Sequence, residues 1–137
     1  MQAVLLDTCA VIWLAEGEPL AKPATEALGA AVARGLDTLV SPITAWEVGL
    51  LVSRGRLQML TTPQRWFARV LGFPGMQLAE MSPELLIAAS FLPGKPPRDP
   101  ADRIIAATAR DLGAALITRD RVLLDYGAQG HLSVVAC

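Results

Sequence analysis

Four acidic residues from distant parts of the chain stand where carboxylates could gather at one site. Asp7 follows the apolar run AVLL, Asp120 follows ALIT by two residues, and Glu47 and Asp102 lie in segments of helical spacing. Carboxylates a few ångströms apart raise one another's pKa, and a divalent cation relieves that repulsion. Because oxygen ligands suit hard cations, the set predicts a Mg²⁺ or Mn²⁺ site. Such ions can activate a water for phosphodiester hydrolysis.

Glu47 is the most informative of these acids because its helix face is otherwise apolar. The residues four before it and three and four after it, which share that face, are Ile43, Leu50 and Leu51. A buried ionised carboxylate without a partner costs several kcal/mol, so a cation or a hydrogen-bond donor is expected beside it. The alternative is a buried ion pair with an arginine, for which Arg103 is the candidate.

Asp99 and Asp102 stand three residues apart at the start of a predicted helix. Pro100 takes the first helical position, so Asp99 is expected to be the N-cap and to accept from the amide of Asp102 or a neighbour. Asp102 is expected to face inward, where the helix N-terminus favours negative charge, together with Ile105, Ala106 and Ala109. An alternative role for Asp99 is that of a second metal ligand. A helix cap is also the alternative role for Asp7 and Asp120.

Short apolar strands alternate with helices, and this order predicts an α/β sandwich around a mainly parallel sheet. The expected strands are residues 3–6, 38–40, 76–81, 114–118 and 132–136. The expected helices are 8–17, 23–35, 42–55, 62–72, 82–91 and 100–112, with a further one over 121–127 that Asp120 could cap. Ligands of such sheets bind beyond the carboxyl ends of the strands, where the acids fall.

The composition indicates one globular domain over residues 1–137 and no membrane association. Hydrophobic residues make up 53% of the chain, but the longest apolar run, CAVIWLA, is much shorter than the about 20 residues of a membrane-spanning helix. The N-terminus lacks the basic region and the cleavage site of a signal peptide, so a cytoplasmic protein is expected. A net charge of −1 does not indicate a nucleic-acid binder. Ten of the twelve basic residues are nevertheless arginine, which suits phosphate oxygens.

Nitrogen and sulfur ligands for a metal are scarce. Cys9 and Cys137 lie at opposite ends of the chain and form neither a disulfide framework nor a zinc signature. The single histidine, His131, is expected at a strand edge or in a loop. Any metal is therefore expected to be held by oxygen.

The runs LLDTCAVIWL, SPITAWEVGLLVSRGRL, RDPADRIIAATA and LITRD occur in this order over nearly the whole chain. In order and spacing they resemble the PIN-domain nucleases, and among them the VapC toxins of bacterial toxin–antitoxin pairs. The resemblance implies a PIN domain, a three-layer α/β/α sandwich with about five mainly parallel strands and an acidic pocket for Mg²⁺ or Mn²⁺. The family's catalytic acids map onto Asp7, Glu47, Asp102 and Asp120. Many relatives carry a histidine where this chain has Pro97.

The resemblance also implies a substrate, RNA in single strands or loops, cut without a protein nucleophile. The candidate metal ligands are Asp7, Asp102, Asp120 and, as the open case, Asp99. The candidate substrate-binding residues are Thr8, which could orient a water or a ligand acid, and the phosphate binders Arg98, Arg103 and Arg119. Plainer alternatives are a helix-capping role for the hydroxyl and pairing of each arginine with a site acid.

By the same resemblance the protein is a homodimer silenced by a VapB-type antitoxin. The antitoxin would lay a helix or an extended segment into an apolar groove and often place an arginine in the acid pocket. Residues that could line this groove serve equally well as core residues: Trp46, Leu50, Leu51, Leu57, Met59 and Trp66.

Two other functions are compatible with an aspartate after the first strand. A phosphatase of the haloacid-dehalogenase type needs a second aspartate two residues later, where this chain has Cys9. A non-catalytic binding module, whose acids hold a structural cation or dock a basic partner segment, stays open as the alternative to a nuclease.

Overall fold

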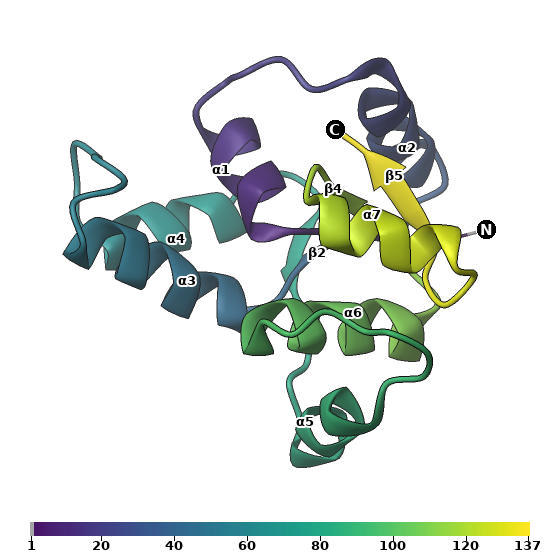
Figure 1. Ribbon diagram of the computed structural model, residues 1–137. Coiled ribbons are helices and arrows are strands. Elements are labelled where there is room, and N and C mark those ends of the chain that lie inside the picture. The colour runs from purple at the N-terminus through teal and green to yellow at the C-terminus, as the bar shows by residue number, and fades with distance from the viewer. Residues whose placement is uncertain (1) are drawn as a thin grey trace.

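Five parallel strands form the centre of the fold (Figure 1). The computed structural model describes residues 2–137. The strands are β1 (Val4–Leu6), β2 (Thr38–Val40), β3 (Met76–Leu78), β4 (Ala115–Thr118) and β5 (Val134–Ala136), in the order β3-β2-β1-β4-β5. Each neighbouring pair is parallel, and β1 pairs with β2 on one side and with β4 on the other. The predicted mainly parallel sheet is confirmed.

Helices cover both faces of this sheet, which gives the three predicted layers. The first face carries α1 (Thr8–Ala15), α2 (Lys22–Ala33) and α4 (Pro63–Leu71), and the second carries α6 (Pro100–Leu112) and α7 (Arg121–Ala128). α3 (Pro42–Ser53) contributes Val48 to the first core and Ile43 to the second. α5 (Pro83–Ala88) and the 3₁₀ turn η1 (Ala89–Phe91) pack on the outer side of α6 (Figure 1).

Side chains of β1 enter both cores because successive residues of a strand point to opposite faces. Val4 and Leu6 pack in the first core and Leu5 in the second, and all three are buried. Between residues 2 and 137 no helix combines the length and the apolar character that crossing a membrane requires.

Several helices begin with a capping hydroxyl and a proline in the first turn. The hydroxyls of Ser41, Thr62 and Ser82 each accept a hydrogen bond, at 3.2 Å, from an amide two or three residues later. These hydroxyls satisfy amides that have no partner within the helix. At the C-terminal end of α6, Gly113 adopts a φ of 61°, a left-handed conformation that glycine takes without steric cost. The predicted bounds of α6 are therefore confirmed.

Two predicted strands are too long. The strand expected over 76–81 ends at Leu78, and the strand expected over 132–136 begins only at Val134. Both lie at an edge of the sheet and pair with one neighbour, whose own strand is three or four residues long, so pairing stops where the neighbour stops. The helix expected over 82–91 ends at Ala88 and tightens into η1.

Candidate active site

Asp7 lies at the carboxyl end of the central strand, and only 5% of it is exposed. Its Oδ1 accepts a hydrogen bond from the amide of Thr8 at 2.8 Å, which makes it the N-cap of α1. Its Oδ2 accepts from the hydroxyl of Thr118 at 2.7 Å and from the thiol of Cys9 at 3.5 Å. Asp7 therefore caps a helix and also presents a buried carboxylate at the edge of the sheet.

Thr118 joins Asp7 to the second acid of this edge, Asp120. While its hydroxyl donates to Asp7, the same oxygen accepts from the amide of Asp120 at 3.0 Å. Asp120 in turn caps α7, since its Oδ2 accepts from the amide of Leu123 at 3.0 Å. One hydroxyl thus links the carboxylate of Asp7 to the backbone of Asp120 where β1 and β4 end.

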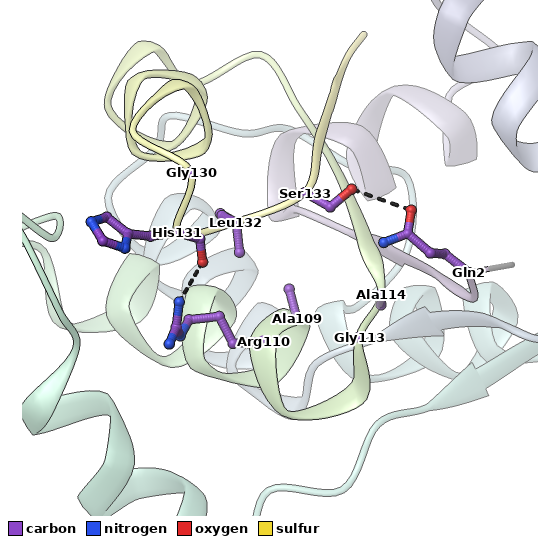
Figure 2. A pocket seen from close by; sticks show the side chains of 9 residues that line it. All are labelled: Gln2, Ala109, Arg110, Gly113, Ala114, Gly130, His131, Leu132 and Ser133. Atoms are coloured by element: carbon purple, nitrogen blue, oxygen red, sulfur yellow. Dashed lines mark hydrogen bonds between the residues drawn. The ribbon is translucent and has the colours of Figure 1, made fainter.

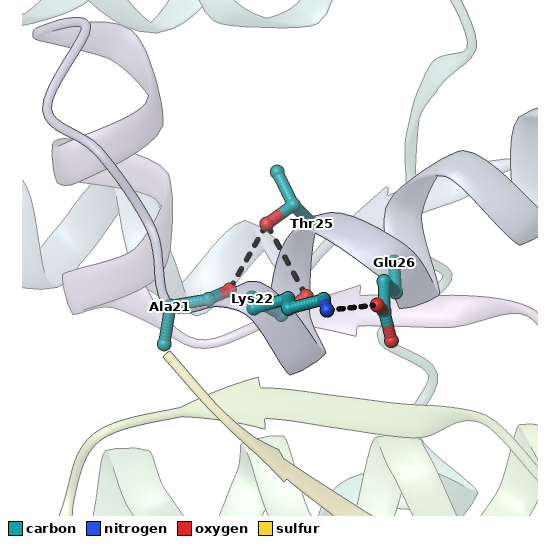
Figure 3. Close-up of polar contacts among 4 residues, drawn as sticks. All are labelled: Ala21, Lys22, Thr25 and Glu26. Atoms are coloured by element: carbon teal, nitrogen blue, oxygen red, sulfur yellow. Dashed lines mark hydrogen bonds and ion pairs between the residues drawn. The ribbon is translucent and has the colours of Figure 1, made fainter.

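Glu47 reaches the site from α3 and finds a hydroxyl instead of an arginine. The hydroxyl of Thr8 donates to Oε1 of Glu47 at 2.5 Å and lies 3.0 Å from the hydroxyl of Thr44. Within residues 2–137 the only ion pair joins Lys22 and Glu26 on the exposed side of α2 (Figure 3). The alternative in which an arginine neutralises Glu47 is therefore wrong.

Glu47, Asp99 and Asp102 form the tightest group of acids. One carboxylate oxygen from each lies within 4.8 Å of those of the other two. Asp99 is the N-cap of α6 as predicted, with its Oδ1 accepting from the amide of Asp102 at 3.0 Å. Capping uses only Oδ1 of Asp99 and leaves Oδ2 available to bind a metal ion. The same residue can therefore serve as helix cap and as candidate ligand.

Burial and mutual repulsion raise the pKa of three acids at this site, Asp7, Glu47 and Asp102. The pKa of Asp102 is raised to about 7, by burial first and then by the charges of Asp7, Asp99, Asp120 and Glu47. Burial also raises the pKa of Asp7 and of Glu47, against the hydrogen bonds from Thr118 and Thr8 that lower them. Carboxylates that repel one another in this way, with no cationic side chain paired to them, fit a divalent cation held by oxygen.

Cys9 does not add a sulfur ligand to this set. Burial and the charge of Asp7 raise the pKa of its thiol to about 12. Because only the thiolate binds metals well, the protonated thiol acts as a weak hydrogen-bond donor to Asp7.

Arg103, a predicted phosphate binder, points to backbone carbonyls. Its Nε donates to the carbonyl of Ala89 at 2.9 Å, its Nη1 to that of Pro97 at 3.0 Å and its Nη2 to that of Ser90 at 3.2 Å. One guanidinium therefore fastens η1 and the loop before Asp99 to α6. Its role in the structure is to position the segment that carries Asp99.

Replacing Arg103 by alanine is expected to lower the free energy of unfolding by about 2–4 kcal/mol, because hydrogen bonds to a charged donor are lost at three carbonyls. Urea unfolding measures the change. Arg65→Ala, which removes an exposed arginine of α4, is the matched control and is expected to change little. An unchanged midpoint in Arg103→Ala would contradict the fastening role.

The other two predicted phosphate binders differ from each other. Arg119 stacks on the ring of Trp13, with its guanidinium carbon 3.3 Å from the ring centroid, and donates to the carbonyl of Cys137 at 3.3 Å. Arg98 is exposed, next to Asp99, and its side chain forms no hydrogen bond or ion pair within residues 2–137. Arg98 thus remains a candidate phosphate binder from the loop that leads into Asp99.

A pocket of about 300 Å³ lies beside the acids, between α3 and the start of α6. Besides Glu47 and Asp99 it is lined by residues that include Trp46, Leu50, Arg54 and Arg56. Sequence reasoning did not single out the two arginines. The signal was present, because Glu47, Leu50 and Arg54 are spaced three and four residues apart and so share one helix face.

The residues predicted to line either a groove or the core differ in burial in the structure. Trp66 is a core residue with 9% exposure, and Leu57 and Met59 pack partly buried against the same core. Leu50 and Leu51 are half-buried, whereas Trp46 is 56% exposed.

A second pocket, of about 430 Å³, lies at the opposite end of the sheet from the acids. It is formed where Gln2 and Ala114 precede β1 and β4 (Figure 2). His131 lies here, in a loop as predicted, with its carbonyl accepting from Arg110 and its ring 5.1 Å from that of Tyr126. The single histidine is therefore remote from the acidic cluster.

The fold and the site together define an α/β/α protein with a cluster of carboxylates at the carboxyl edge of a parallel sheet. The sequence model of the PIN domain matches residues 4–129, so the chain belongs to the PIN domain family. The predicted resemblance is thereby confirmed.

Individual relatives agree with this assignment. The chain is 32% identical, over 92% of its length and 93% of the relative's, to Ribonuclease VapC22 of Mycobacterium tuberculosis. Among solved structures, it matches a chain of VapBC2 from Rickettsia felis, crystallised bound to a DNA fragment from its promoter, with a TM-score of 0.67, 16% identity and 98% of both chains covered. It also matches FitAcB from Neisseria gonorrhoeae, with a TM-score of 0.55, 20% identity and 96% and 95% of the two chains covered.

Proposed function

We propose that this chain is a Mg²⁺- or Mn²⁺-dependent endoribonuclease, the toxin of a toxin–antitoxin pair that acts in the cytoplasm. The observation that carries the proposal is the cluster of Glu47, Asp99 and Asp102, whose oxygens lie within 4.8 Å of one another with no cationic partner. The name of the 32% identical relative, a ribonuclease, supports the choice of RNA over other phosphodiesters.

The donor set fits a hard divalent cation, because the three side chains that converge most closely are all carboxylates. Glu47, Asp99 and Asp102 would hold the ion, with Asp7 and Asp120 at its flank. When bound, the ion supplies positive charge that acidifies a water and neutralises the leaving oxygen of a phosphodiester.

The chain's own residues prepare the site in three ways. Thr118 and Thr8 donate hydrogen bonds that fix Asp7 and Glu47 in one orientation. α1, α6 and α7 begin at the site, so their N-terminal partial charges favour the carboxylates of Asp7, Asp99 and Asp120. Arg98, which precedes Asp99 in the sequence and is exposed, would bind a phosphate of the substrate.

The purified protein is expected to cleave single-stranded RNA with Mn²⁺ or Mg²⁺ and to lose this activity in EDTA, with recovery on adding either ion. Removing the ion removes the charge that neutralises the leaving oxygen. Gel analysis of a labelled RNA measures the cleavage. His131→Ala, which changes a residue at the other end of the sheet, is the control and should cleave at the wild-type rate. Cation binding without cleavage would favour the non-catalytic binding module.

We also propose a VapB-type antitoxin as partner and a homodimer as the working form. The structural relative from Rickettsia felis is a VapBC2 assembly, and the apolar pocket of about 610 Å³ between α3 and α4 offers a surface for a partner segment. Its apolar lining includes Val48, Val52 and Phe67. Co-expression with the product of a neighbouring small gene and light scattering of the purified protein test the two proposals separately.

A further inference from the structure

We propose that the pocket lined by Trp46, Arg54 and Arg56 is a binding subsite for single-stranded RNA, in which an unpaired base stacks on Trp46 and the two arginines bind backbone phosphates. This subsite rests on the proposed ribonuclease function and extends it. It assigns substrate binding to residues on and just after α3, outside the acidic cluster.

The cluster itself cannot attract RNA. Asp7, Glu47, Asp99, Asp102 and Asp120 bring negative charge to the place where a phosphate must approach, and the chain as a whole has a net charge of −1. Binding of single strands draws on cationic side chains along the backbone path. Free cations next to the acids are therefore required, and the pocket supplies two of them.

Arg54 and Arg56 are available for this role. Both are exposed, and within residues 2–137 neither side chain forms an ion pair or a hydrogen bond. Arg103 and Arg119, by contrast, are engaged with backbone carbonyls. Seven residues of helix separate Glu47 from Arg54, a rise of about 10 Å, so Arg54 would meet a phosphate next to the one at the acids.

Trp46 is the tryptophan with a free ring. Trp66 is buried in the core, and Trp13 lies under the guanidinium of Arg119. Trp46 is 56% exposed, adjoins Glu47 in sequence and lines the same pocket as both arginines. An exposed aromatic ring beside a cationic groove is the usual platform on which single-stranded bases stack.

The chemistry of the pocket favours RNA. Arg54 and Arg56 give the pocket positive charge, which suits an anionic ligand. A nucleotide satisfies all parts of the pocket at once, since its phosphate suits the arginines and its base suits the indole. A volume of about 300 Å³ is at the lower end for ligand pockets and suits one nucleotide unit.

Binding is best measured in the Asp7→Asn background, which should bind RNA without hydrolysing it. With a labelled single-stranded RNA of mixed sequence, Trp46→Ala is expected to raise Kd about tenfold or more, whereas Trp46→Phe should stay within about threefold of the parent. A duplex of the same sequence should show no Trp46→Ala effect, because its bases are already stacked. The double variant Arg54→Ala, Arg56→Ala should weaken binding and reduce the slope of log K against log salt by about 1.4.

Matched controls remove an exposed aromatic ring and an exposed arginine elsewhere. Phe91→Ala on η1, where Phe91 is 80% exposed, and Arg65→Ala on α4 should leave both Kd and the salt slope unchanged. Unchanged Kd and kcat/KM in Trp46→Ala and in the double arginine variant, with wild-type cleavage intact, would overturn the subsite alone. Absence of RNA cleavage by the wild type would instead overturn the proposed function. Retained RNA affinity with lost antitoxin affinity would make the pocket a protein docking site.

Discussion

Asp7→Asn is expected to lower the rate of Mn²⁺-dependent RNA cleavage by at least about a hundredfold while the protein stays folded. Asparagine keeps an oxygen that can accept from the amide of Thr8, and the two residues are equivalent as N-caps. The substitution removes the buried charge and places an amide where Thr118 and Cys9 now donate. Several kcal/mol of transition-state stabilisation depend on such charges, and each 1.36 kcal/mol is a factor of ten.

Initial rates on a labelled RNA, together with urea unfolding, separate the catalytic loss from a loss of stability. Asp125→Asn is the matched control, because Asp125 is an exposed aspartate of α7 away from the cluster. Cleavage at the wild-type rate by Asp7→Asn would remove Asp7 from the site. A large drop in stability with parallel loss of activity would instead assign Asp7 mainly to capping α1.

The metal-free protein is expected to lose stability as the pH rises from about 4 to about 7. The pKa of Asp102 is about 7 in the folded chain, and those of Asp7 and Glu47 are raised as well. Between the unfolded and the folded pKa, the folded state binds more protons than the unfolded state, so each added unit of pH favours unfolding. Divalent cations bind the deprotonated acids and should oppose this loss.

Thermal unfolding in EDTA at pH 5 and at pH 8 measures this effect, with the higher melting temperature expected at pH 5. Asp102→Asn removes the carboxyl with the pKa of about 7 and should flatten the dependence. Saturating Mn²⁺ should raise the melting temperature most at pH 8. A metal-free protein that is more stable at pH 8 than at pH 5 would mean that the acids are not crowded as described.

Much of the fold follows from local signals in the sequence. Ser41 with Pro42, and Asp99 with Pro100, mark helix starts because a capping side chain and a missing amide both suit the first turn. Gly113 marks a helix end because it tolerates a positive φ. The lengths of edge strands were harder to predict, since they depend on a neighbour distant in sequence.

The acids of the site were predictable, but their partners were not. The position of Asp7 follows from a strand that ends in a cap, whereas Thr118, which donates to its Oδ2 at 2.7 Å, is 111 residues away in sequence. Likewise, nothing local tells that Arg103 fastens carbonyls of η1 while Arg54 stays free beside Glu47. Tertiary packing decides whether such a side chain binds the backbone or stays available for a phosphate.

The central place of β1 in the sheet sets the order in which the site can be completed during synthesis. β1 lies between β2 and β4, and Asp7, which follows β1, is synthesised 111 residues before its partner Thr118. At about 5–20 residues per second, several seconds pass between the two. A nascent chain therefore carries an incomplete acidic site until Thr118 has been made, and a cell making the proposed toxin has this interval before the first molecule can cut RNA.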